Sequence, residues 1–75
     1  MHFDRITHNP DVHAGKPCVR GSRITVTHVL SLVANGMTFQ QIIEEYVDLE
    51  IEDVRQAVQY GAWLANHEHR PLTAP

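Results

Sequence analysis

The spacing of hydrophobic residues divides the chain into an irregular first third and a helical remainder. From residue 26 onward, apolar side chains recur at the three-to-four-residue interval of amphipathic helices, whereas residues 1–24 alternate only weakly. We therefore predict a mainly α, single domain over residues 1–75. It has short strands and a basic Gly/Pro turn over 1–24, a three-helix bundle over 25–66, and a frayed tail over 67–75.

Short strand pieces, arranged as a small hairpin, are predicted for the first third. The candidate strands cover residues 5–8 and 18–24, with an Asn-Pro-Asp turn signal at 9–11 and a Gly-Ser turn at 21–22. An isolated hairpin is only marginally stable in water, so these strands cannot form a stable sheet alone.

The first two helices carry clear start and stop signals. Thr25 is a suitable N-cap for the first helix, and Gly36 is a favoured residue just beyond its end. Thr38 followed by Gln41 gives the capping-box pattern at the start of the second helix.

The third helix is predicted from residue 50 or 51 to about residue 66, with an unusually wide apolar arc. The arc contains Ile51, Val54, Ala57, Val58, Tyr60, Gly61, Ala62, Leu64 and Ala65. Two interpretations stay open for the surplus: the N-terminal strands pack over it, or Tyr60, Leu64 and Trp63 form a dimer interface, where aromatic residues are enriched. We favour a homodimer, because a chain of this length buries little core on its own.

Composition limits the class of protein. Cys18 is the only cysteine, so the chain permits no internal disulfide and fits a reducing compartment. No apolar run approaches the roughly 20 residues of a membrane span, and no signal-peptide pattern is present. We expect a cytoplasmic protein that does not contact a membrane.

The net charge of −3 argues mildly against DNA binding by a lone monomer, but the charges are unevenly distributed. The early basic group is Lys16, Arg20 and Arg23, with Arg5 nearby, and the late acidic group is Asp48, Glu50, Glu52 and Asp53. Such a chain has two electrostatically different surfaces and hence room for two partners.

Two regions are candidates for binding. In the basic turn, Arg20 and Arg23 suit bidentate contacts to phosphate or carboxylate, and Lys16 adds a point charge. The layout of the helices is that of a helix-turn-helix domain, which would place Arg55 and Gln56 near a DNA major groove. The neighbouring acids would repel phosphate. Two alternatives remain. The basic turn is a solvated loop without a ligand, and residues 37–66 form a purely structural helical scaffold.

Catalysis and metal binding are not expected. His8 with His13, and His67 with His69, lack the spacing of a structural zinc site, and one cysteine is too few for common zinc fingers. Cys18 has no identifiable base. We predict no enzyme activity, no metal and no cofactor.

The basic turn and its surroundings strongly resemble the domain-of-unknown-function family 433. The residues that carry the resemblance are Arg5, Ile6, Thr7, Asn9, Pro10, the run Gly15-Lys16-Pro17-Cys18-Val19-Arg20-Gly21-Ser22-Arg23-Ile24-Thr25-Val26, Leu30, Gly36, Ile42, Ile43, Glu44, Glu45, Tyr46, Leu49, Glu52, Asp53, Val54 and Ala57. The resemblance covers about residues 5–66. One departure is Glu50, where the family often has Thr or Ser; it removes a favoured N-cap and adds negative charge.

This resemblance implies a short strand region followed by a homeodomain-like helix-turn-helix bundle. It also implies the antitoxin half of a type II, VapBC-like toxin–antitoxin pair in a prokaryote, with a PIN-like nuclease as toxin partner and operator DNA as a further partner. The residues expected to bind toxin or DNA are Lys16, Arg20, Arg23, Arg55 and Gln56. The alternatives are an interaction module of helix-turn-helix shape without DNA binding, and a free-standing DNA-binding regulator.

Overall fold

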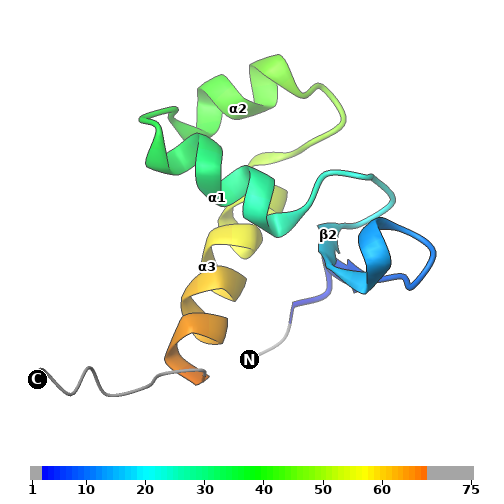
Figure 1. The fold of residues 1–75 in the computed structure, drawn as a ribbon. Helices are drawn as coiled ribbons and strands as arrows, with labels where there is room; N and C mark the ends of the chain where they lie inside the picture. Colours follow the sequence, from blue (N-terminus) through cyan, green and yellow to red (C-terminus); the bar gives the residue numbers. More distant parts are fainter. Residues whose placement is uncertain (1–2, 68–75) are drawn as a thin grey trace, which may run out of the picture.

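The computed structural model describes residues 3–67 and confirms a mainly helical fold with a small N-terminal hairpin (Figure 1). Strands β1 (Ile6–His8) and β2 (Pro17–Val19) precede helices α1 (Val26–Ala34), α2 (Phe39–Glu45) and α3 (Ile51–His67). Helix α3 packs against both α1 and α2. The frayed tail was predicted from residue 67, but α3 extends to His67; the rest of the predicted tail, residues 68–75 with His69, lies outside the described residues.

The hairpin is antiparallel, with Ile6 opposite Val19 and His8 opposite Pro17. Its long connection contains the predicted turn, where the side chain of Asn9 accepts a hydrogen bond from the backbone N–H of Asp11 at 2.9 Å. A single 3₁₀ turn, η1 (His13–Gly15), follows with positive φ angles at all three residues. Left-handed backbone is costly for residues other than glycine, so this connection has a specific and strained shape.

The predicted helix caps are confirmed. Thr25 Oγ1 accepts from the His28 N–H at 3.0 Å, which satisfies a free donor at the start of α1. At the start of α2, Thr38 Oγ1 accepts from the Gln41 N–H at 3.1 Å, and Gln41 Oε1 accepts from the Thr38 N–H at 2.8 Å. Gly36 follows α1 with φ 94°, as expected of a C-terminal glycine.

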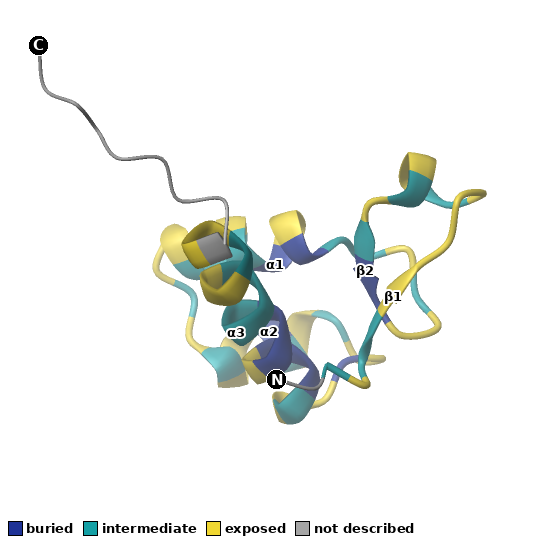
Figure 2. Cartoon of the chain, turned by 90° about the horizontal axis from the view of Figure 1, so that it is seen from below, coloured by how far each residue is buried: buried dark blue, intermediate teal, exposed yellow. Residues whose placement is uncertain are grey.

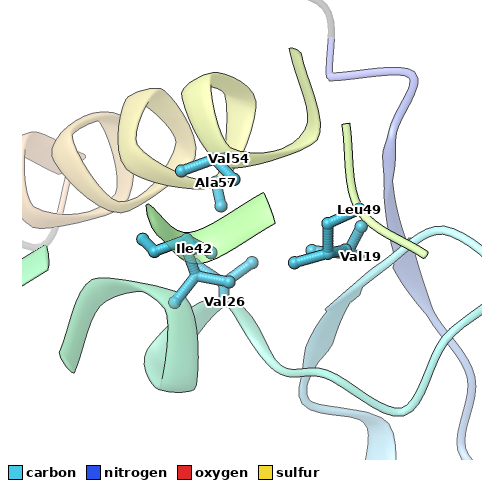
Figure 3. Close-up of a cluster of buried hydrophobic side chains, with 7 residues drawn as sticks. Val19, Val26, Ile42, Leu49, Val54 and Ala57 are labelled. Atoms are coloured by element: carbon cyan, nitrogen blue, oxygen red, sulfur yellow. The ribbon is translucent and has the colours of Figure 1, made fainter. Parts of the chain in front are cut away.

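The hairpin shares a core with the helices. Figure 3 shows the buried side chains at this junction, which are Val19, Val26, Val29, Ile42, Leu49, Val54 and Ala57. Val19 comes from β2 and is fully buried, whereas the loops of the hairpin are largely exposed (Figure 2). Val19, together with the partly buried Ile6 of β1, therefore joins the hairpin to the apolar core of the bundle.

Candidate functional site

A buried carboxylate at the start of α3 holds the hairpin in place. Asp53 has no exposed surface, and its Oδ2 accepts from the backbone N–H of Glu50 at 2.8 Å. Its Oδ1 accepts from Arg5 at 3.0 Å, and its Oδ2 also accepts from Arg20 at 3.2 Å. Arg5 directly precedes β1 and Arg20 directly follows β2, so a single side chain of α3 holds the open end of the hairpin, opposite its long connection.

Glu50 adds a second, exposed carboxylate to the same group. Its Oε1 accepts from Arg5 at 2.7 Å and from Arg20 at 3.0 Å. The hydrogen bond from Arg5, together with the positive charges of both arginines, lowers the pKa of Glu50. The same pairing with Glu50 and Asp53 raises the pKa of Arg5. We call Arg5, Arg20, Glu50 and Asp53 the charge cluster.

Gln56, predicted to lie near DNA, is largely buried. Its Oε1 accepts from the backbone N–H of Arg5 at 3.0 Å, and its Nε2 donates to Asp4 at 2.8 Å and to Glu52 at 3.3 Å. The amide is thus engaged with the N-terminal segment rather than with the surface. Base reading by Gln56 would require these bonds to break.

Arg55 lies on the exposed face of α3, but it is paired. Its guanidinium makes two hydrogen bonds to Glu52, at 2.9 and 2.7 Å. The bond to Arg55 is the main cause of the lowered pKa of Glu52, followed by the bond from Gln56. The exposed start of α3 therefore presents Arg55 together with the carboxylates of Glu50 and Glu52.

The other two predicted binding cations remain available. The side chains of Lys16 and Arg23 are exposed and make no hydrogen bond or ion pair within residues 3–67. Arg20, by contrast, is committed to the charge cluster. The three cations of the basic turn thus divide into one that pairs internally and two that face solvent.

Two of the three residues predicted for a dimer interface, Tyr60 and Trp63, lie in an aromatic group with Phe3. Phe3 packs edge-on against Tyr60, with ring centroids 5.2 Å apart, and contacts Trp63 at 5.9 Å. His8 Nε2 lies 3.1 Å from the Tyr60 hydroxyl. The N-terminal segment therefore covers part of the wide apolar arc, as one of the two interpretations proposed. Trp63 is still 36% exposed, and Leu64 is half-buried.

The sequence contained only a partial signal for the charge cluster. The sequence places Asp53 only in the late acidic group, and Arg5 only near the basic turn. The pairing joins residues 48 positions apart, between Arg5 and Asp53, so no local pattern shows it. The one local signal is that Asp53 is the third residue of α3, a position from which a carboxylate can accept a hydrogen bond from the backbone at the start of the helix.

No cluster of three or more potential metal ligands occurs among residues 3–67. Within the same range, no helix has the length and apolar content needed to cross a bilayer.

This arrangement, a two-stranded hairpin fixed to a three-helix bundle, is shared with known proteins. The chain belongs to the family described as Protein of unknown function (DUF433), which it matches over residues 6–61. A crystal structure of a DUF433 member protein from Anabaena variabilis has the same fold, with a TM-score of 0.78 over 85% of this chain and 63% of that chain, at 23% identity.

A relative from Sinorhizobium fredii, Uncharacterized protein y4eO, is 36% identical over 56 residues. The aligned region is 75% of this chain but only 25% of that protein, so the chain spans about a quarter of the length of this curated relative.

Proposed function

We propose that this chain is an antitoxin-like interaction module that binds a PIN-like nuclease through the exposed cations of its basic turn. The observation that carries the proposal is the division of the turn's cations: Arg20 is paired with the charge cluster, whereas Lys16 and Arg23 have no partner among residues 3–67. PIN-like nucleases hold a divalent metal with clustered carboxylates. Exposed lysine and arginine side chains are complementary to such an acidic surface.

The strained connection of the hairpin supports this role. His13 and Ala14, shortly before Lys16, adopt φ angles of 48° and 54°. Arg20, four residues after Lys16, is fixed to α3 by its ion pair with Asp53. Strained backbone persists only where the surrounding structure holds it, and it is frequent at binding sites. A preorganised turn loses less entropy on binding than a flexible one.

Operator binding is the second candidate, and one observation favours it. Helices α2 and α3 are joined by a short connection, as in helix-turn-helix proteins, and Arg55 is exposed on α3. However, Glu52 pairs with Arg55 and Glu50 is exposed just before the start of the same helix, so phosphate contacts there would meet two negative charges. We therefore rank protein binding above DNA binding.

The test is copurification of the untagged protein from its native host, followed by mass spectrometry. We expect a small PIN-like nuclease in stoichiometric amount. The Lys16→Ala/Arg23→Ala double variant should lose this partner, while Arg55→Ala, which removes an exposed cation from α3, should retain it. Recovery of the wild-type protein without a nuclease would contradict the proposal.

DNA binding is measured separately, by titrating the wild-type protein onto the DNA upstream of its own gene at several salt concentrations. Phosphate contacts release counterions, so a true operator complex weakens steeply as salt rises. Operator binding would be established by a steep slope of log affinity against log salt concentration that Arg55→Ala reduces by about one. Absence of binding at low salt would remove it.

A further inference from the structure

A small cavity lies between the hairpin and the turn that follows it. Its volume is about 270 Å³, and its lining includes Asn9, Val12, Cys18, Ser22 and Arg23. Drug-sized ligands occupy pockets of about 300–1,000 Å³, so this cavity suits a single side chain or a small molecule rather than a nucleotide. The hairpin that contains it projects from one side of the helices (Figures 1 and 2).

Among the polar side chains that line the cavity, Arg23 and Asn9 keep unused donors, whereas the Thr7 hydroxyl donates to the carbonyl of Cys18 at 3.5 Å. The guanidinium of Arg23 has no hydrogen-bond partner within residues 3–67. The Asn9 side chain uses its oxygen to accept from Asp11, which leaves its amide N–H groups as donors. The Ser22 hydroxyl is already committed, since it donates to the carbonyl of Val19 and accepts from the N–H of Ile24.

This inventory calls for an acceptor that carries negative charge. None of the described residues that line the cavity is acidic. A guanidinium matches the two oxygens of a carboxylate in a bidentate pair. Val12 and the buried Cys18 add an apolar wall, which suits the methylene groups that precede the carboxylate.

We propose that this cavity binds a carboxylate carried on a short aliphatic stem, with Arg23 and Asn9 as its donors and Val12 against the stem. The carboxylate comes from a free small acid or from an acidic side chain of a partner protein. This assignment goes beyond the proposed function, because it defines a receptor on this chain and does not require that the partner is a nuclease.

The test is a titration of the ¹⁵N-labelled full chain with glutarate, followed by two-dimensional NMR at constant ionic strength. We expect saturable shifts of the backbone amides of Asn9, Ser22 and Arg23. Arg23→Gln should weaken glutarate binding about tenfold, the loss of one charge-assisted pair. Lys16→Gln is the matched control: it removes the same charge from the neighbouring turn but does not line the cavity, so binding should be nearly unchanged.

Further probes distinguish the ligand. Inorganic phosphate lacks a stem and should bind more weakly than glutarate, and tighter binding of phosphate would overturn the carboxylate assignment. Stronger binding of glutarate than of the capped peptide acetyl-Gly-Glu-Gly-amide would indicate a free acid, and the reverse order a partner side chain. Shifts that do not saturate, or equal losses in Arg23→Gln and Lys16→Gln, would overturn the site itself, whereas a failed copurification of a nuclease would leave it unaffected.

Discussion

Asp53 combines complete burial with a negative charge, a combination that proteins tolerate only when the charge is well paired. It accepts hydrogen bonds from two arginines and one backbone N–H, and these donors compensate for the burial of its charge. The residue thereby links a helix start to the hairpin. Asp53 mainly fixes the position of the hairpin on α3. Its net contribution to stability is small, because the free energy of desolvating the buried charge offsets much of the attraction to the arginines.

We expect Asp53→Asn to lower the free energy of unfolding by about 2 kcal/mol, as charged hydrogen bonds to Arg5 and Arg20 are lost. The loss is limited because both arginines keep Glu50 and partial access to water. Urea denaturation measures the change. Glu52→Gln makes the same acid-to-amide substitution in the same helical turn, where the partner Arg55 is exposed, and should have a much smaller effect. Equal losses in the two variants would show that the buried position has no special role.

At the scale of single elements, the sequence predicted well those features that depend on residues no more than four positions apart. The caps of α1 and α2 follow this rule, since Thr25, Thr38 and Gln41 bond to backbone groups three positions away. The docking of the hairpin does not, because Arg20 and Asp53 are 33 positions apart. For the same reason the engagement of Gln56 by the N-terminal segment could not be derived from the spacing of residues on α3.

Attachment of the hairpin to α3 should depend on pH. The pKa of Glu50 is lowered in the folded protein by Arg5 and Arg20, so the unfolded chain binds the proton more readily. The stabilisation is therefore complete above the ordinary pKa of glutamate, about 4.3, and is lost as the pH falls below it. We expect the urea midpoint to fall between pH 6 and pH 3.

Glu50→Gln should lower the midpoint at pH 6 and flatten its decline toward pH 3. Glu45→Gln is the control, because Glu45 is exposed at the end of α2 and has no ion pair within residues 3–67. An unchanged pH dependence in Glu50→Gln would contradict the assigned role of the charge cluster.

Close approach of α1 and α3 depends on Gly61. A Cβ atom at this position would lie 2.7 Å from Cδ1 of Leu30, too close without movement of that side chain. Alanine gains about 1 kcal/mol over glycine in a helix, whereas overpacking costs about 1–3 kcal/mol. We expect Gly61→Ala to lower the free energy of unfolding by about 1 kcal/mol as the balance of these effects.

The effect of Gly61→Ala on stability should change sign when the Leu30 side chain is truncated. In a Leu30→Ala background, Gly61→Ala should raise stability by about 1 kcal/mol, because only the helix propensity remains. Urea denaturation of the four proteins in this double-mutant cycle gives the coupling energy. Additive effects would show that α1 and α3 are not in contact at this point.

For the molecule as a whole, the wide apolar arc of α3 is only partly covered from within. Phe3 packs against Tyr60 and Trp63, yet Trp63 remains 36% exposed at the end of α3 farthest from the charge cluster. We propose that a second copy of the chain covers this aromatic surface, with Tyr60, Trp63 and Leu64 at the interface. Residues 3–67 bury a small core, so association would add stability.

Sedimentation equilibrium should detect a dimer of the wild-type protein that Trp63→Ala weakens by about tenfold or more, the effect of removing a central aromatic contact. Circular dichroism should show that the variant keeps its fold, since Trp63 lies outside the core. Val47→Ala provides the control: Val47 is 82% exposed in the connection between α2 and α3, so its loss removes apolar surface elsewhere. A monomeric wild-type protein would contradict the proposed interface, as would equal weakening by both variants. If Trp63→Ala unfolds, the main role of the indole is instead to hold Phe3 and the N-terminal segment on α3.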